Sequence, residues 1–498
     1  MTSRSSQSIA IAAFVGLVIY GFLVVSHAYY AVWGADATGY ANTARSILER
    51  QIVQPLAALD QLELSDQFIY LFSPLGYEQG PRPRTIAPIY PVGVPLHMAG
   101  AASIIGWKFG PFLVSPLAAV LSLLLVYLVG RELGLTRRLA IAGAAMLALN
   151  PTFCLAAIQP MSDAPATCWS LAAILAALRS RGREVWGLPA GAAFGMAFLV
   201  RPTSVLLLIA IFLSLRFKPK VLLLFLLGGL PFIGIFCSYN AIAYGHPLQT
   251  GYFATRHQDL VMLSGFTTRL RHYIYWLTAT MSPLPLIGWL CVTLDRNVKI
   301  RDRALIISWF GAFLLFYSCY FHYATWWYTR FLLPAMPALI LGTLLIVRDL
   351  VKFHEHLAVG RRGIWLRRAA VTILLVVVLG FERQSVEHFR LLRVAAQDMV
   401  FADSCRWADR ILPNQALVVS MEMSGAVKYY TGRPIVRYER VDAEQWKTLQ
   451  ARAAEKGFQW YALLMPEEIE QAHRHLPGRW TKLGMFRQIS LWQIEPGF

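Results

Sequence analysis

Residues 112–130 read FLVSPLAAVLSLLLVYLVG, and residues 131–138, which follow directly, read RELGLTRR. The first stretch carries no charged side chain and is close to the roughly 20 apolar residues that a helix needs to cross a bilayer. The second stretch is short and basic, and Lys and Arg accumulate in the cytoplasmic connections of membrane proteins. Together they predict a membrane-spanning helix that ends on the cytoplasmic side.

The same pairing recurs along most of the chain. Apolar runs are expected to span the membrane at 9–26, 112–130, 139–157, 164–178, 186–200, 202–215, 221–243, 275–294, 304–321, 331–347 and 366–381. Basic connections lie at 131–138, 179–184, 216–220, 295–303 and 348–368, and together they hold 19 Lys and Arg against 6 Asp and Glu. We therefore predict an α-helical polytopic membrane protein with about 11 spans and a cytoplasmic N-terminus. The other connections (31–110, 158–163, 244–274 and 322–330) and the tail would then be extracytoplasmic.

The composition supports this class. The 498 residues are 56% hydrophobic and only 15% charged, whereas soluble domains carry about 25% charge. The net charge is +18, but residues 381–498 contribute little of it, with 16 basic and 14 acidic residues. The excess lies between the apolar runs, which argues against nucleic acid as a partner. The six cysteines form no CxxC motif, so neither a structural disulfide nor a zinc site is predicted.

Two domains are expected. Residues 1–380 form the transmembrane domain, whose first extracytoplasmic loop (31–110) carries interfacial helices near 36–50 and 93–107. Residues 381–498 form a small extracytoplasmic α/β domain with a Rossmann-like sheet. Its expected strands are at 416–421, 434–438, 460–465, 480–486 and 489–494, and its expected helices at 425–430 and 466–473. The tail contains no GxGxxG motif, so no nucleotide is expected there.

Two carboxylates at the predicted outer membrane edge are candidates for chemistry. Asp36 directly follows the first span, and Asp163 lies between two apolar runs in QPMSDAP (159–165). Each is equally suited to cap the N-terminus of a helix, since Asp is favoured there. Each is also a functional candidate, because acidic residues at membrane depth are costly and Asp can act as a general base.

Four arginines fall on the outer side, where the charge bias makes them less expected: Arg82, Arg84, Arg201 and Arg330. A guanidinium stays charged and matches phosphate bidentately, although such arginines also extend from the interface to lipid headgroups. The outward histidines (His246, His257, His272 and His322) lack HxxxH spacing, so a divalent metal held with Asp36 is left open. No Walker A, GxSxG or HExxH motif is present.

Several sequence blocks together resemble the C-superfamily (GT-C) glycosyltransferases, in the branch that groups protein O-mannosyltransferases with the aminoarabinose transferase of lipid A. In chain order the blocks are GADATGYANTAR (34–45), APIYPVGVPL (87–96), QPMSDAP (159–165), GAAFGMAFLVRP (191–202), YNAIAYGHPLQTGY (239–252), RFLLP (330–334) and SGAVKYYTGR (424–433). Their order and the predicted topology carry the resemblance, which covers nearly all of residues 10–440.

The resemblance implies a polyprenyl-phosphate sugar as donor and transfer to a lipid, glycan or protein hydroxyl on the extracytoplasmic face of the bacterial inner membrane. Asp36 matches the family's catalytic acidic residue in the first outer loop, and Asp163 the second acidic position. The four arginines would bind the donor phosphate. The blocks supply substrate-binding candidates in Tyr40, Tyr90, His246 and Tyr252, and Tyr328 just before the RFLLP block is a further candidate. Relatives often have an Asp-Glu pair after the first helix, whereas here Asp36 is followed by Ala37. The acceptor is therefore not assigned.

In the expected reaction Asp36 takes the proton of the acceptor hydroxyl, and the arginines stabilise the leaving phosphate. A single displacement would invert the anomeric centre. Two other classes of membrane protein are also consistent with many apolar helices: a transporter, and a non-catalytic membrane assembly protein. Transporters commonly carry internal repeats and helices interrupted near the midplane, and neither is apparent in this sequence.

Overall fold

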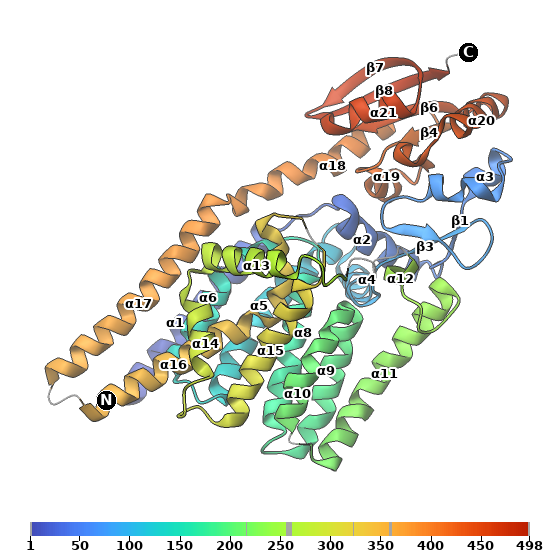
Figure 1. Ribbon diagram of the computed structural model, residues 1–498. Helices are drawn as coiled ribbons and strands as arrows, with labels where there is room; N and C mark the ends of the chain where they lie inside the picture. The colour runs from blue at the N-terminus through green and yellow to red at the C-terminus, as the bar shows by residue number, and fades with distance from the viewer. Residues whose placement is uncertain (1, 216, 255–260, 322, 358–360, 497–498) are drawn as a thin grey trace. The chain divides into compact units, whose positions relative to one another are not determined.

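The computed structural model describes residues 2–215, 217–254, 261–321, 323–357 and 361–496 (Figure 1). The chain divides into two compact units. The first unit comprises Met1–Ala28, Leu113–Gly234 and Asp259–Arg393, and the second comprises Tyr29–Phe112, Ile235–Gln258 and Val394–Phe498. The segments of each unit come from distant parts of the sequence, so neither unit could be assembled by short-range pairing.

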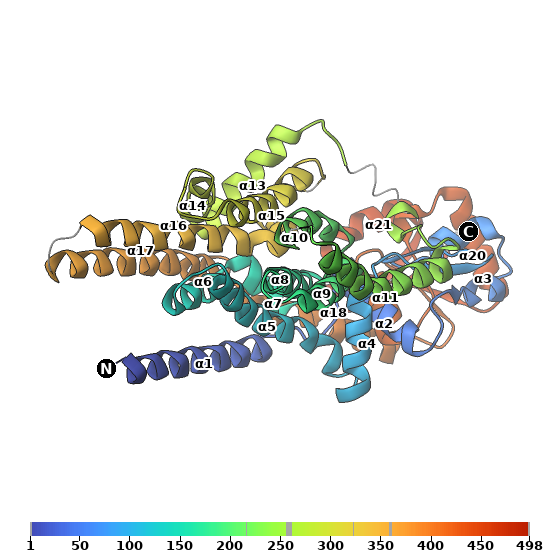
Figure 2. The same cartoon turned by 90° about the horizontal axis from the view of Figure 1, so that it is seen from below.

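The first unit is helical. Its elements are α1 (Thr2–Ser26), most of α5 (Gly110–Glu132), α6 (Arg137–Leu149), α7 (Pro151–Ile158), α8 (Asp163–Arg179), η2 (Glu184–Trp186), α9 (Gly187–Val200), η3 (Pro202–Leu206), α10 (Leu207–Leu215), the first part of α11 (Pro219–Tyr244), α13 (Phe266–Met281), α14 (Leu284–Val292), α15 (Ile300–Ser318), η5 (Trp326–Ala335), α16 (Met336–Leu357) and α17 (Arg361–His388). Helices α8, α9 and α10 run side by side (Figures 1 and 2).

Among the described residues, four helices are long and apolar enough to cross a membrane: Gln7–Ser26, Gly110–Glu132, Pro219–Tyr244 and Trp326–Lys352. A fifth is added if α6 and α7, which meet at a bend of 67°, count as one broken span. The mostly helical membrane architecture is therefore confirmed, and the count of about 11 spans stays a prediction.

Proline explains where two predicted spans are interrupted. Between α6 and α7, Asn150 accepts a hydrogen bond from the backbone N–H of Phe153 at 2.9 Å and so caps a new helix that begins at Pro151. Proline lacks a backbone N–H and restricts the preceding residue, so the first helix cannot continue through it. The expected run 275–294 is likewise divided between α13 and α14 at Ser282, whose φ is +64°, just before Pro283.

Small residues let helices of this unit approach closely. A Cβ added at Gly191 of α9 would lie 1.8 Å from the carbonyl oxygen of Phe225 in α11, and one added at Gly228 would lie 2.0 Å from the carbonyl oxygen of Leu188. Only glycine fits at either position. Such close backbone contacts are typical of helices that associate inside a bilayer, where packing replaces the hydrophobic drive.

The second unit mixes short helices with two sheets. Its elements are α2 (Gly34–Leu48), β1 (Gln54–Pro55), α3 (Ala57–Gln61), η1 (Asp66–Phe72), β2 (Tyr77–Gln79), β3 (Thr85–Pro88), α4 (Gly93–Ile105), α12 (Gly251–Ala254), most of α18 (Leu391–Ile411), β4 (Ala416–Val419), α19 (Ser424–Thr431), β5 (Ile435–Val436), η6 (Tyr438–Arg440), α20 (Ala443–Glu455), β6 (Gln459–Leu464), η7 (Pro466–Glu468), α21 (Ile469–His475), β7 (Gly478–Phe486) and β8 (Ile489–Pro496).

The tail forms a five-stranded sheet in the order β5-β4-β6-β8-β7. Strand β4 pairs in parallel with β5 and β6, whereas β8 pairs antiparallel with β6 and β7. The strands lie where the sequence places them, but the sheet is mixed because β7 and β8 form a hairpin. Side chains alternate along β4: Leu417 and Val419 join one buried cluster, and Ala416 and Val418 join another.

The first of these clusters joins segments that the sequence analysis assigns to different domains. It contains residues of β4, β6 and α20 together with Leu59, Leu62 and Phe68 from the first loop. A sheet face rich in Val, Leu and Trp must be covered, and residues 56–86 supply part of that cover. The first loop is therefore part of the same compact unit as the tail.

Helix α2, which carries Asp36, is tied directly to α19 of the tail. Asn42 donates to the Gly425 carbonyl at 3.1 Å, and Arg45 donates to the Tyr429 carbonyl at 2.8 Å. The Arg45 guanidinium also lies 4.2 Å from the centre of the Tyr429 ring. A Cβ at Gly425 would lie 2.4 Å from Oγ1 of Thr38, so this contact depends on glycine.

Lys428 of α19 gives the second unit a measurable pH dependence. Burial lowers the pKa of its ammonium from 10.5 to about 8, despite the nearby carboxylate of Glu49. Between pH 8 and 10.5 the folded chain releases this proton while the unfolded chain keeps it, so stability rises with pH across that window. We expect Lys428→Met to increase the free energy of unfolding at pH 7 by about 1–3 kcal/mol. The variant should also lose the increase in stability between pH 8 and 10.5.

Thermal unfolding of the purified protein between pH 7 and 10 measures this effect. Lys447→Met is the matched control, since the side chain of Lys447 is 75% exposed on α20. An unchanged pH profile in Lys428→Met would show that this ammonium is not the titrating group.

Candidate active site

Asp36 lies in the first turn of α2 and is held by Tyr90. The N-cap of this helix is Trp33, so Asp36 does not have the N-capping role that was the alternative to a functional one. The hydroxyl of Tyr90 donates to Oδ1 of Asp36 at 3.0 Å. Burial, and then the neighbouring Asp36 carboxylate, raises the pKa of Tyr90 well above its ordinary value. The phenol therefore stays protonated and orients the carboxylate.

Aromatic side chains and one glycine surround this pair. The rings of Tyr40 and Tyr90 lie 4.9 Å apart, and Tyr252 is close enough to act electrostatically on the Tyr90 hydroxyl. A Cβ added at Gly39 would lie 2.1 Å from Cε2 of Tyr90. Three of the predicted substrate-binding tyrosines thus gather beside Asp36, and Gly39 leaves the space that the Tyr90 ring occupies.

Replacing Gly39 by alanine should displace the Tyr90 ring and break its hydrogen bond to Asp36. Overpacking of this kind costs roughly 1–3 kcal/mol, and we expect transfer activity to fall at least about tenfold. The control is Gly100→Ala in α4, where no atom lies within 4 Å of an added Cβ. Thermal unfolding and transfer rates of both variants test this, and equal activity of the two would contradict it.

Asp163 forms ion pairs with two of the four predicted arginines. It begins α8 next to the N-cap Ser162 and is 2% exposed. Its Oδ1 accepts from Arg201 at 2.5 Å, and its Oδ2 lies 3.7 Å from Nη1 of Arg330. The side chains of Arg201 and Arg330 are 12% and 15% exposed. One carboxylate and two guanidiniums leave this buried cluster with a net positive charge.

Further side chains, which the sequence analysis missed, surround these arginines. Arg201 donates to Oγ of Ser162 at 3.0 Å, and the Tyr317 hydroxyl shares a hydrogen bond of 2.7 Å with Thr203. Ser162 directly precedes Asp163 in the sequence, and Thr203 lies two residues after Arg201, which was the available signal. The Arg330 guanidinium lies 4.8 Å from the Trp327 ring centre. Tyr328 packs 5.5 Å from Phe331 in the same segment.

Arg84 and Arg82 are placed differently. Arg84 pairs with Asp60 and Asp66 and donates to the Leu64 carbonyl at 2.7 Å. These contacts use Nε and both terminal nitrogens, which favours a structural role in the first loop. Arg82 is exposed, and its carbonyl accepts from Thr85 at 2.6 Å.

His246 lies in the turn after α11. Its Nδ1 accepts a hydrogen bond from the backbone N–H of Leu248 at 3.2 Å, and its side chain is exposed. His257 and His322 lie outside the described residues. No three His, Cys, Asp or Glu side chains of the described ranges come together as a metal-binding group.

A cavity of about 590 Å³ opens at the start of α2. Its lining includes Trp33 and Gly34, and the carboxylates of Glu422 and Glu467 with the carboxamide of Gln488 face it from the tail. Burial, and then the charge of Glu467, raises the pKa of Glu422. The guanidinium of Arg487 also lines the cavity. An indole, two carboxylates, an amide and a guanidinium are groups suited to a hydroxyl-bearing ligand.

Comparison with protein families identifies one matching segment. The model of the family described as dolichyl-phosphate-mannose-protein mannosyltransferase matches residues 90–236. This segment contains Tyr90, Asp163 and Arg201, while Asp36 and Arg330 lie outside it. No curated protein matches the chain by sequence.

Solved structures extend the likeness to the whole chain. ArnT from Cupriavidus metallidurans, in a structure bound to undecaprenyl phosphate, is 12% identical with a TM-score of 0.61, covering 99% of this chain and 98% of ArnT. AftD from mycobacteria, an arabinofuranosyltransferase, is 14% identical with a TM-score of 0.58 over 99% of this chain and 42% of AftD. AglB from Archaeoglobus fulgidus is an oligosaccharyltransferase solved with dolichol-phosphate and an inhibitory peptide. It is 12% identical with a TM-score of 0.53, over 92% of this chain and 70% of AglB.

These likenesses confirm the resemblance that the sequence blocks indicate. The structural likeness establishes the fold. At these low identities it does not assign roles to individual residues, so those roles are argued from the geometry of the site.

Proposed function

We propose that this chain, which has the fold of the GT-C glycosyltransferases, is a membrane glycosyltransferase that moves a sugar from a polyprenyl-phosphate donor to a hydroxyl acceptor. The observation that carries the proposal is the end-to-end likeness to ArnT, whose solved structure holds undecaprenyl phosphate. The family match over residues 90–236 supports the same class.

The arginine cluster is suited to the donor phosphate. Arg201 and Arg330 present two guanidiniums against one carboxylate, so the cluster has positive charge to offer an anion. Both arginines are largely buried, and a charge in a poorly hydrated site acts more strongly on a ligand than one in water. As the sugar leaves, negative charge develops on the phosphate, and the arginines would stabilise it.

Asp163 is better suited to positioning than to accepting a proton. Both of its oxygens face guanidinium groups, and removing it would leave two buried cations without their counter-charge. We therefore assign Asp163 to hold Arg201 and Arg330 in place, and we retain Asp36 as the general base.

Asp36 has the surroundings of a base that acts on a hydroxyl. Tyr90 fixes the orientation of its carboxylate through a donated hydrogen bond. In the proposed reaction the acceptor oxygen attacks the anomeric carbon, its proton passes to Asp36, and the bond from that carbon to the phosphate oxygen breaks. The products are the glycosylated acceptor and polyprenyl phosphate, with the anomeric configuration inverted. The cavity at the start of α2 is the proposed acceptor site.

The topology completes the proposal. We place about 11 spans in the bacterial inner membrane, with the N-terminus in the cytoplasm and the tail outside. This assignment is supported by the 19-to-6 excess of basic residues in alternate connections.

Deleting the gene and restoring it in trans tests the function in cells. The account predicts that one modification of an envelope lipid, glycan or protein disappears on deletion and returns with the wild-type gene but not with Asp36→Asn. Full restoration of that modification by Asp36→Asn, at equal protein level, would contradict the enzymatic role.

A further inference from the structure

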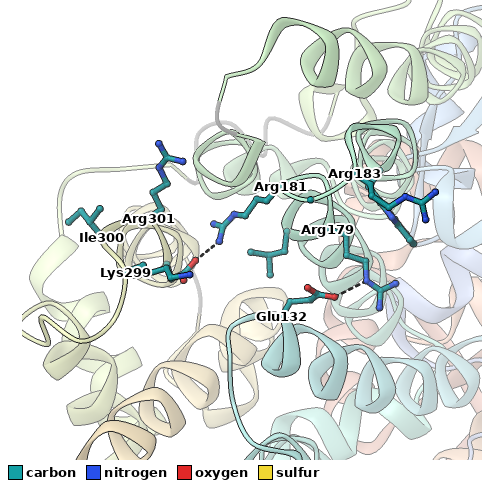
Figure 3. A pocket seen from close by; sticks show the side chains of 11 residues that line it. Glu132, Arg179, Arg181, Arg183, Lys299, Ile300 and Arg301 are labelled. Atoms are coloured by element: carbon teal, nitrogen blue, oxygen red, sulfur yellow. Dashed lines mark hydrogen bonds and ion pairs between the residues drawn. The ribbon is translucent and has the colours of Figure 1, made fainter.

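A second cavity, of about 610 Å³, lies in the first unit at the ends of α5, α8 and α15 (Figure 3). All of its charged lining residues belong to the basic connections 131–138, 179–184 and 295–303, which the charge bias places in the cytoplasm. The residues proposed for sugar transfer lie in other connections, so the proposed reaction does not use this cavity.

Its lining is strongly basic. The cationic side chains are Arg179, Arg181, Arg183, Lys299 and Arg301, against the two carboxylates of Glu132 and Asp302. Both carboxylates are already paired: Arg179 lies 3.0 Å from Glu132 and Arg181 lies 2.5 Å from Asp302, as the dashed lines in Figure 3 show.

Three cations remain uncompensated. Among the described residues, none of Arg183, Lys299 and Arg301 forms an ion pair. All three are exposed, so they can reach a ligand without leaving a buried partner behind. One nitrogen of Arg181, Nη2, is buried without a hydrogen-bond partner in the described structure. A site with this excess of donors is suited to a phosphate group.

The rim of the cavity also carries exposed apolar side chains, which favours a lipid over a soluble anion. Ile300 lines the cavity and is 67% exposed, and Val185 next to the lining Trp186 is 56% exposed. The Trp186 ring lies 4.9 Å from the guanidinium of Arg179. Tryptophan is enriched at the level of lipid headgroups, where acyl chains can cover exposed aliphatic side chains.

We propose that this cavity binds the phosphate headgroup of an anionic phospholipid of the inner leaflet. Basic pockets between membrane helices on the cytoplasmic side are suited to such headgroups. A free phosphate would meet the same cations but gain nothing from the apolar rim.

The test uses the purified full-length protein in nanodiscs that contain phosphatidylcholine and phosphatidylglycerol. Native mass spectrometry then counts the lipids of each kind that the protein retains. The test variant is Arg183→Gln/Lys299→Gln/Arg301→Gln, and the charge-matched control is Arg137→Gln/Arg138→Gln/Lys352→Gln, whose positions do not line the cavity.

We expect the wild type and the control to retain phosphatidylglycerol preferentially. In the test variant the preference should fall roughly a hundredfold, because each basic side chain near an anionic headgroup contributes about fivefold. Added inorganic phosphate should leave the retained lipid in place.

Equal retention by the wild type and a folded test variant would overturn the proposal, as would displacement of the lipid by inorganic phosphate alone. Lipid retention requires no sugar transfer, so this result is independent of the fate of the proposed enzymatic function.

Discussion

Asp36→Asn is expected to lower sugar transfer by about 10²–10⁴-fold while the protein folds normally. The amide that replaces the carboxylate cannot take a proton from the acceptor hydroxyl. It can still accept the hydrogen bond that Tyr90 donates at 3.0 Å to Asp36, so the local structure should survive. Initial rates of transfer, measured with saturating donor, report the loss directly.

Glu444→Gln is the matched control for this variant. Glu444 also lies in the first turn of a helix, α20, and is exposed, so it loses one negative charge without touching the candidate site. We expect its transfer rate to match the wild type. If Asp36→Asn were as active as this control, Asp36 would not be the base.

The second large effect is expected at the arginine cluster. Arg201→Gln removes the partner that lies 2.5 Å from the buried Asp163. Arg330, 3.7 Å from Asp163, still compensates part of its charge, so the cost should stay below the roughly 3–5 kcal/mol typical of an unpaired buried charge. We expect a lower unfolding temperature and the loss of transfer. Adding Asp163→Asn removes the carboxylate that has lost its nearer partner, but it also takes the counter-charge from Arg330, so we expect it to restore only part of the stability.

The transfer activity of the Arg201→Gln/Asp163→Asn double variant distinguishes a functional role of Arg201 from a structural one. If Arg201 binds the donor phosphate, the double variant stays inactive although it regains part of its stability. Recovery of both properties would show that Arg201 serves only to neutralise Asp163. Arg433→Gln is the control, since Arg433 pairs with Asp409 at 2.7 Å in the tail, and its loss should affect stability alone.

Local patterns allowed much of the fold to be predicted. Long apolar runs predicted helices such as Gly110–Glu132, and short apolar or β-type runs predicted the strands of the tail. Helix α20 was missed although Asp442 and Gln445 form a capping box at its start. That signal was present in the sequence, but the segment has few large apolar side chains to mark a buried helix face.

The candidate site could be predicted as a set of residues but not as an arrangement. The spacing of residues in the sequence does not predict that Arg84 pairs with Asp60 and Asp66. It equally does not predict that Arg201 and Arg330 pair with Asp163. The role of Gly39 was equally hidden, because its need for a missing Cβ arises from Tyr90, which lies far along the chain. Such contacts depend on tertiary packing, which a single sequence does not encode locally.

The most direct test of the account follows the lipid product. The purified full-length protein in nanodiscs would be incubated with polyprenyl-phosphate sugars and an envelope extract as acceptor, and the release of polyprenyl phosphate would be measured. The account predicts time-dependent release by the wild type with at least one donor, and little release by Asp36→Asn. Equal release by folded wild type and Asp36→Asn, or none by the wild type with any donor of a full hexose and pentose panel, would contradict it.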